Sequence, residues 1–210
     1  MKKIFTVFIA FLFITHFFYA QEEEESYKAD PFERAYSPGN VYFNAGVNFL
    51  FRNYSPSVFN FWNNYNYRTT LPVLASLEVG INEYLSFGGY IGFHSYGWDY
   101  RTSVGSYDYA YRRFGYGVRG SFHYLYLIND LLDLELDEKH IDLYATIMIG
   151  LNTRSETRKE PGLTTTDVRT NGSFGTLLGF RYMFNNTFGA YLEGGRGSLG
   201  FANIGLTLKF

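Results

Sequence analysis

The sequence predicts an all-β protein, an eight-stranded antiparallel up-and-down transmembrane β-barrel. Three observations support this fold. Apolar residues alternate with small or polar residues along eight segments, and a period of two indicates a strand with two unlike faces. The composition is rich in aromatic residues and glycine, with 22 Phe, 20 Tyr and 22 Gly among 210 residues. The segments are about ten residues long, the length that a tilted strand needs to cross a bilayer.

The composition also excludes several classes of protein. The chain has no cysteine, so a disulfide framework and a thiolate metal site are both excluded. The mean hydropathy of −0.16 excludes a bundle of membrane helices, each of which would need about 20 consecutive apolar residues. The aromatic content is far above that of disordered chains.

The first 20 residues are predicted to be a secretory signal peptide. Lys2 and Lys3 precede an apolar run that ends at Ala20, and we expect cleavage after Ala20. An uncleaved membrane anchor is the alternative. Loss of the two lysines changes the net charge from −2 to −4. Residues 21–39 have no periodicity and are predicted to form a mobile N-terminal tail, so the barrel is expected to span residues 40–210.

Four strands are expected in the first half of the barrel. In each of them an apolar face is opposed by a face of small or polar residues, as in a half-buried strand. Their ranges, each with one pair of opposed residues, are Val41–Phe51 (Phe43 against Asn44), Val73–Ile81 (Leu77 against Glu78), Leu85–His94 (Phe87 against Ser86) and Phe114–Tyr124 (Val118 against Arg119).

Four further strands show the same alternation in the second half of the chain. Their polar faces carry mainly Gly, Ser, Thr and Asn, with single charged residues among them. These ranges are Ile141–Gly150 (Leu143 against Asp142), Phe174–Tyr182 (Phe180 against Arg181), Phe188–Glu193 (Leu192 against Glu193) and Asn203–Phe210 (Leu208 against Lys209).

The connections between these strands alternate in length. Long irregular segments are expected at 53–70, 99–109 and 153–170, whereas Asn82–Tyr84 and Asn185–Thr187 form tight turns. A medium acidic connection covers 128–139, and a short glycine-rich turn near Gly197–Gly200 is the exception among the long ones. Long connections at one end and short turns at the other are typical of outer-membrane barrels, in which the long loops lie outside the cell.

The polar face is predicted to line the lumen. A soluble barrel is the alternative, but a face in contact with water would be dense in Lys and Glu, whereas small residues suit the cramped interior of an eight-stranded barrel. The lumenal charges should pair, because an isolated buried ion is costly. We expect a salt-bridge plug, with a narrow gated path for small solutes as the alternative. The expected network comprises Glu78, Asp142 and Glu193 with Arg119, Arg181 and Lys209.

The last strand ends in Gly205-Leu206-Thr207-Leu208-Lys209-Phe210. With this ending, residues 41–210 resemble the small eight-stranded outer-membrane barrels of the OmpA, OmpX and OmpW type, at the level of pattern. The resemblance implies a location in the outer membrane of a Gram-negative bacterium, and we expect a monomer. It also implies that the barrel-assembly machinery reads Gly205, Leu208 and Phe210 as an assembly signal.

The charges are polarised along the predicted barrel axis. Cationic residues dominate the long loops, and acidic residues dominate the short turns, including the acidic 130–138 segment. Arginine makes bidentate contacts with phosphate, so Arg112, Arg113, Arg154 and Arg158 are predicted to form a rim that binds lipopolysaccharide or other anionic surface glycans. An ordinary solvated loop surface is the alternative.

The aromatic residues of 58–67 and 96–111 are interpreted as strand continuing above the membrane, and such surfaces also suit adhesion.

A structural or surface-interaction role is therefore the favoured function, and a narrow porin-like channel is the alternative. Some resembling barrels are acyl-transfer or deacylation enzymes, so a lipid-modifying enzyme is the more distant third. We expect no enzyme, because no serine or carboxylate has a recognisable catalytic spacing beside His94, His123 or His140. No metal-ligand set is identified, no cofactor is expected, and nucleic acid is excluded as a partner by the near-zero charge of the barrel.

Overall fold

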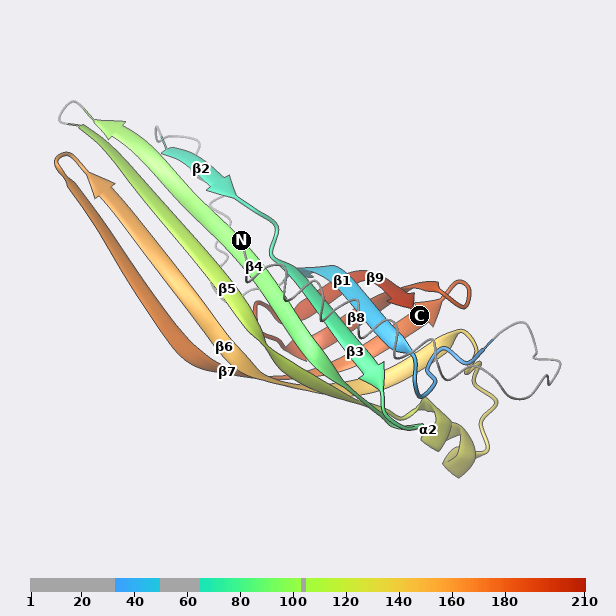
Figure 1. The fold of residues 1–210 in the computed structure, drawn as a ribbon. Helices are drawn as coiled ribbons and strands as arrows, with labels where there is room; N and C mark the ends of the chain where they lie inside the picture. The colour runs from blue at the N-terminus through green and yellow to red at the C-terminus, as the bar shows by residue number, and fades with distance from the viewer. Residues whose placement is uncertain (1–32, 50–64, 103–104) are drawn as a thin grey trace, which may run out of the picture. The chain divides into compact units, whose positions relative to one another are not determined.

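The computed structural model describes residues 33–49, 65–102 and 105–210. Within these ranges the chain forms antiparallel strands and one short helix (Figure 1). In chain order the elements are β1 (Val41–Phe49), β2 (Tyr65–Thr69), β3 (Val73–Gly80), β4 (Leu85–Thr102), β5 (Gly105–His123), α2 (Leu125–Leu132), β6 (Ile141–Glu160), β7 (Leu163–Met183), β8 (Phe188–Arg196) and β9 (Ala202–Lys209).

Eight of these strands close into a ring. Each strand from β3 to β8 pairs with the next one along the chain, and β1 pairs with both β3 and β9. Reciprocal backbone hydrogen bonds between Val41 and Phe210, at 2.8 and 3.0 Å, complete the closure. Among the described strands, the remaining one, β2, pairs with β4 alone. The predicted eight-stranded antiparallel barrel is confirmed.

Side chains alternate between the two surfaces of the barrel wall. On the outside, Phe87, Ile91, Phe174 and Leu178 are each more than half exposed, at 52 to 65%. On the inside, asparagine, serine and charged residues are almost completely buried. An apolar exterior around a buried polar interior is the reverse of a soluble barrel, and it is the arrangement that the sequence predicts.

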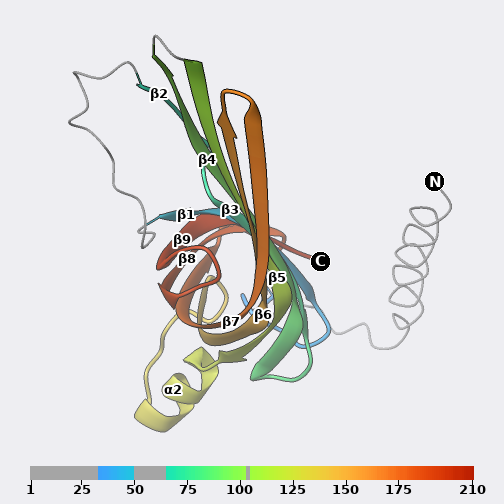
Figure 2. The same ribbon diagram turned by 90° about the vertical axis from the view of Figure 1, so that its left-hand side faces the viewer.

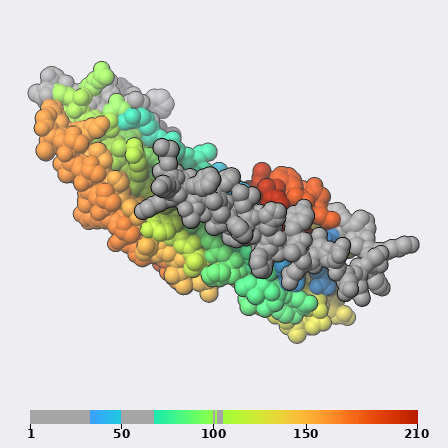
Figure 3. Space-filling model, in the orientation of Figure 1, coloured from blue at the N-terminus to red at the C-terminus, as the bar shows by residue number. Residues whose placement is uncertain are grey.

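Four strands continue far beyond the others. β4, β5, β6 and β7 have 18 to 21 residues, compared with eight or nine in the rest of the ring. Figures 1 and 2 show that their outer halves form a tall twisted sheet, which we call the extension. In Figure 3 its β6–β7 hairpin, in orange, and α2, in yellow, lie at opposite ends of the molecule.

Two predicted loops therefore need correction. Residues 99–109 and 153–170 are not irregular, because β4–β5 and β6–β7 continue through most of them. The second hairpin is rich in threonine, which favours strands, and its hydroxyls pair across the strands at Thr153–Thr170 (3.0 Å) and Thr157–Thr166 (3.3 Å). The extended-sheet interpretation of 96–111 is confirmed. Within 53–70, β2 is a strand, and positions 50–64 lie outside the described residues.

The opposite end of the barrel has tight turns and α2, and we call it the α2 end. The Asn82 side-chain carbonyl accepts hydrogen bonds from the amides of Tyr84 and Leu85, both at 2.9 Å. Asn185 forms the same kind of turn on the other side of the ring. Both predicted turns are confirmed, and α2 begins just before the predicted acidic connection. Among the described residues, no helix combines the length and the apolar character needed to cross a membrane.

Two strand ends and the N-terminal segment differ from the prediction. Tyr124 caps α2 instead of ending β5, and β8 continues past Glu193 to Arg196. Residues 33–39, expected to belong to a mobile tail, pack against the α2 end. Ala35 is fully buried and its amide donates to the Glu138 carbonyl at 2.8 Å. The predicted signal peptide and the rest of the tail, residues 21–32, lie outside the described residues.

Glycines in the wall permit close approach of neighbouring groups, and Gly179 gives a test of the inward packing. A Cβ on Gly179 would lie 2.2 Å from the Tyr144 ring, whereas one on Gly172 of the same strand would meet nothing within 4 Å. We expect Gly179→Val to lower the free energy of unfolding by about 1–3 kcal/mol, as overpacked cores do. Urea unfolding of the refolded barrel in detergent measures the effect. Gly172→Val is the matched control, and an equal loss in both variants would contradict this packing.

Candidate functional site

Arg119 joins three strands across the lumen. Its guanidinium lies 3.0 Å from a Glu78 carboxylate oxygen through Nε and 2.7 Å from Glu193 Oε1 through Nη2. These partners come from β3 and β8, so the cluster spans the barrel from wall to wall. Arg119 and Glu193 have no exposed surface, and Glu78 is 2% exposed. Neutral donors complete the shell of the carboxylates: Ser121 and Ser86 on Glu78, and Tyr144 and Asn203 on Glu193.

Arg181 forms a second cluster nearer the α2 end. Its Nη1 donates to Asp142 Oδ2 at 2.8 Å. The guanidinium lies over the Tyr42 ring at 4.6 Å and over the Tyr144 ring at 5.1 Å, so cation–π contacts flank the ion pair. Five of the six predicted lumenal charges are thus brought together into two buried clusters.

Lys209 is the exception, and its predicted place in the network needs correction. Its ammonium group donates to the Arg34 carbonyl at 2.8 Å and lies 3.4 Å from Glu33 Oε2. Both partners belong to the N-terminal segment 33–39. The reason is position, because Lys209 ends β9 at the α2 end, beside the point where the chain enters β1. Lys209 therefore anchors this segment across the end of the barrel.

The N-terminal segment covers a buried histidine. The Tyr36 ring stacks on the His123 ring with centroids 3.5 Å apart and planes 9° apart. The Tyr36 hydroxyl shares its single proton between the carbonyls of Asn82 and Leu85, at 2.8 and 2.7 Å, which fixes the ring over the lumen. We call the Tyr36 ring in this position the Tyr36 lid. A small pocket of about 140 Å³ lies beside it and is lined in part by Tyr36, His123 and Asp142.

His123 lies between a serine and a carboxylate, which spacing in the sequence does not reveal. Its Nε2 is 2.9 Å from Ser86 Oγ, and its Nδ1 is 2.9 Å from Asp142 Oδ1. The order matches that of a hydrolase triad. However, Ser86 Oγ also lies 3.0 Å from Glu78 Oε2, and all three residues are buried. Within the described ranges, no three His, Cys, Asp or Glu side chains converge on a possible metal position.

An apolar layer fills the lumen toward the extension. Leu74, Tyr90, Met148 and Leu177 are inward-facing and at most 6% exposed. The turn between β8 and β9 folds inward above them, because Leu199 is buried and would contact any Cβ placed on Gly92. This layer was not predicted. Its signal in the sequence is a set of large apolar residues at positions where the polar face otherwise has small ones.

The four predicted rim arginines do not form one surface. Arg113 points inward, where its Nη2 donates to the Ser198 carbonyl at 2.8 Å and holds the β8–β9 turn. Arg154 and Arg158 lie over the rings of Tyr111 and Tyr109 at 5.0 and 5.8 Å on the inner face of the extension. Arg112 lies on the outer face. The predicted single rim is therefore wrong in geometry, because neighbouring residues of a strand face opposite ways.

The inner face of the extension is an aromatic ladder. Trp98 stacks on Tyr109 with centroids 4.0 Å apart, and Tyr96 stacks on Tyr111 at 4.4 Å. Burial among its neighbours raises the pKa of the Tyr109 phenol above its ordinary value, against the opposing effect of Arg154 and Arg158. The phenol therefore remains a hydrogen-bond donor at neutral pH.

The residues of the predicted assembly signal lie on β9 and just after it. Gly205 packs directly on the backbone of β1, where a Cβ would lie 2.1 Å from the Ala45 carbonyl oxygen. Leu208 and Phe210 face outward, and Phe210 is 67% exposed. Their reading by the barrel-assembly machinery stays a prediction.

The Arg119 cluster predicts a large stability effect. Arg119→Met removes the charge that pairs with two buried carboxylates, and we expect a loss of about 3–5 kcal/mol in the free energy of unfolding. Arg169→Met is the control, because the Arg169–Asp167 pair is well exposed and should contribute less than about 1 kcal/mol. Urea titrations in detergent micelles compare the two. Equal stability of Arg119→Met and the native chain would show that the carboxylates do not depend on Arg119.

The chain was also compared with known proteins. No protein-family model and no curated protein matches its sequence. Solved structures that are similar include the N-terminal β-barrel domain of Pseudomonas aeruginosa OprF, at 13% identity and a TM-score of 0.40, covering 83% of this chain and 100% of that one. They also include Ail, the attachment invasion locus protein of Yersinia pestis.

Ail is similar in two structures, each of which covers 82% of this chain and 99% of that one. The structure of Ail alone has 12% identity and a TM-score of 0.42. The structure in complex with the heparin analogue sucrose octasulfate has 11% identity and a TM-score of 0.43. The predicted resemblance to small eight-stranded barrels is confirmed for the fold by the closed pairing of eight antiparallel strands in this chain.

Proposed function

We propose that this chain is an integral barrel of the outer membrane of a Gram-negative bacterium, and that it acts through its surface in contact with lipopolysaccharide or other glycans. The apolar exterior supports the location. On β4 the outward apolar residues run from Leu85 to Phe93, about 26 Å along the strand. At the usual strand tilt this is about 20 Å along the barrel axis, near the apolar band of about 25 Å in outer-membrane barrels.

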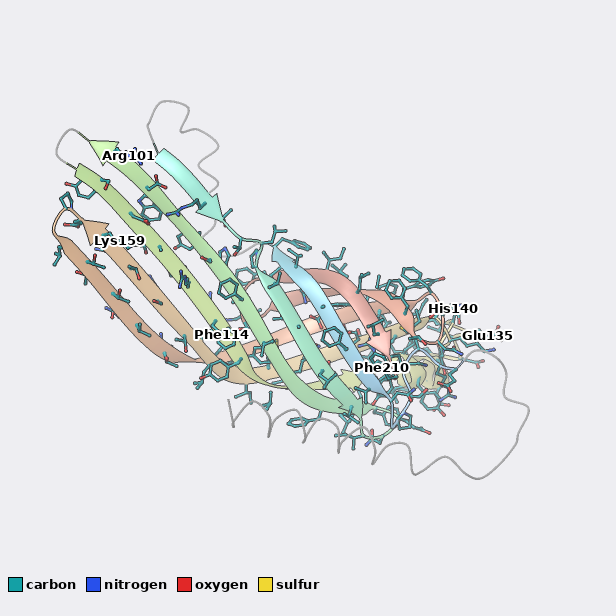
Figure 4. All side chains as sticks on the ribbon, turned by 45° about the horizontal axis from the view of Figure 1, so that its top comes forward. Arg101, Phe114, Glu135, His140, Lys159 and Phe210 are labelled. Carbon is teal, nitrogen blue, oxygen red and sulfur yellow. The ribbon has the colours of Figure 1, made fainter. Side chains whose placement is uncertain are left out.

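The charge distribution supports the orientation. In Figure 4, Arg101 and Lys159 lie at the far end of the extension, whereas Glu135 and His140 lie at the α2 end. Acidic side chains are concentrated in and after α2. In the proposed orientation the extension lies outside the cell, where lipopolysaccharide presents phosphate groups, and the α2 end faces the periplasm.

The observation that carries the proposal is the filled lumen. The Arg119 cluster, the Leu74–Tyr90–Met148–Leu177 layer and the Tyr36 lid lie at successive levels, and their side chains are almost without exposed surface. Such packing favours a structural and surface role over the alternative of a narrow porin-like channel. Burial also argues against an enzyme, because Ser86 is 4% exposed and does not line the pocket beside His123.

Conductance separates the closed barrel from the channel. We expect the folded native protein in planar bilayers to give no reproducible single-channel steps, because the buried ion pairs leave no water path at their level. Heat-dependent electrophoretic mobility confirms that the inserted protein is folded. Discrete, reproducible steps from the native protein would favour the channel and contradict a surface role that depends on a sealed lumen.

The inner face of the extension is the expected contact surface for glycans, because stacked rings with adjacent arginines suit sugar rings and their anionic groups. We expect the double variant Trp98→Ala/Tyr109→Ala to bind the polysaccharide part of lipopolysaccharide about fivefold or more weakly, as loss of aromatic anchors does. Interferometry with the protein in nanodiscs measures the affinity. Thr164→Ala with Thr166→Ala, on the opposite face of the same sheet, is the control. If the two double variants bind the polysaccharide equally well, the inner face is not the contact surface.

A further inference from the structure

The outer face of the extension has its own cavity. It measures about 450 Å³, within the range of about 300–1,000 Å³ that is usual for small-ligand sites. Its floor is formed by Gly97 and Ala110, which are partners in the β4–β5 register. Because these two residues have almost no side chain, the longer side chains around them enclose a depression. We call it the outward pocket; its other lining residues include Arg68, Ser95, Arg112, Thr157 and Lys159.

The outward pocket begins where the apolar belt ends. Phe93 and Phe114 are paired in the β4–β5 register and are both exposed on the outside. Two residues farther along the same strands, and on the same face, Ser95 is paired with Arg112. Two residues correspond to about 7 Å along a strand. The side chains thus change from aromatic rings to an arginine over the distance that separates acyl chains from lipid headgroups.

The pocket has a positive charge that its own acids do not neutralise. Arg68 lies 3.1 Å from Asp108 and 3.7 Å from Asp99, so this arginine and both carboxylates are engaged with one another. Lys159 is the register partner of Asp108, whose carboxylate is held by Arg68. Among the described residues, neither Arg112 nor Lys159 forms an ion pair. Two cations are therefore available to an anionic ligand.

The hydroxyl groups of the pocket add neutral polar contacts. Five hydroxyl residues line it: Thr69, Thr70, Ser95, Ser155 and Thr157. The three threonine hydroxyls already bond Thr166 or backbone groups, so Ser95 and Ser155 supply the hydroxyls that are open to a ligand. Hydroxyl groups can donate to phosphate oxygens and accept from sugar hydroxyls, whereas the cations supply stronger, charge-assisted hydrogen bonds. Arginine above an aromatic belt, with hydroxyls beside it, matches a ligand that has phosphate, sugar and acyl parts.

We propose that the outward pocket binds the phosphorylated sugar headgroup of an outer-leaflet glycolipid, with phosphate between Arg112 and Lys159 and acyl chains over Phe93 and Phe114. The proposal rests on the placement of the barrel in the outer membrane and deepens it by naming the site. A lipid is favoured over a soluble anion because the pocket opens outward, immediately beyond the apolar belt.

The probe is bisphosphorylated lipid A, compared with its dephosphorylated form, added to the full mature barrel in nanodiscs. Native mass spectrometry measures the fraction of protein that retains each lipid. We expect the native chain to prefer the phosphorylated form, and Arg112→Ser with Lys159→Ser to reduce that preference on the order of tenfold, as loss of charge-assisted contacts implies. Arg101→Ser with Lys139→Ser removes the same charge at positions that do not line the outward pocket and should keep the preference.

The arms of the experiment separate the possible failures. An unchanged preference in the Arg112/Lys159 variant, or an equal loss in the Arg101/Lys139 control, overturns the site. Displacement of the lipid by free pyrophosphate at equal concentration would show a solution-facing phosphate site and overturn the lipid assignment. Folding of every variant is checked by heat-dependent mobility. Fractionation of cells tests the membrane location separately, so a native chain absent from the outer membrane would refute the proposed function and not the pocket chemistry.

Discussion

The barrel depends on the pairing of Arg119 with Glu78 and Glu193. A buried guanidinium is tolerated only where carboxylates and neutral donors surround it, and these partners come from strands on opposite sides of the ring. A slip of one residue in β3 or β8 would turn one carboxylate to the outer surface of the barrel and leave the arginine with only one of its two acidic partners. The same interaction therefore neutralises the interior, fixes the register of distant strands and closes the lumen.

Closure of the lumen restricts where the chain can interact with other molecules. The Arg181–Asp142 pair, the Tyr36 lid and the inward Leu199 continue the filling toward both ends. The side chains that fill the lumen therefore stabilise the barrel. Within the described residues, β4 to β7 are the ring strands that continue beyond the others, and their outer halves form a sheet with two faces outside the ring. The ligand contacts that we propose lie on this extension.

Alternation in the sequence was sufficient to predict the number of barrel strands and the face to which each lumenal charge points, because a strand has a strict period of two. This period does not give the position of a residue along the barrel axis, which explains the error at Lys209. Lys209 has the right parity for the network but sits at the end of β9, where Glu33 and Arg34 are nearer. Arg112 and Arg113 were grouped as one rim, although adjacent residues must face opposite ways. The Ser86–His123–Asp142 contact joins three strands, and the Tyr36 lid joins a segment without periodicity to the barrel; neither is encoded by local spacing.

The two faces of the extension differ in how free their charges are. A sheet that has no core on either side is held by its backbone ladders and by cross-strand pairs. On the inner face, Trp98–Tyr109 and Tyr96–Tyr111 are such pairs, and Arg154 and Arg158 lie over two of these rings. Their charges are therefore partly engaged in holding the sheet together. On the outer face, the Thr–Thr pairs of β6 and β7 and the Arg68–Asp108 pair supply the cross-strand contacts. Arg112 and Lys159 are exposed and have no part in these contacts among the described residues, so their charges are free to pair with a bound anion. In the site that we propose, a phosphate at the height of the headgroups is that anion.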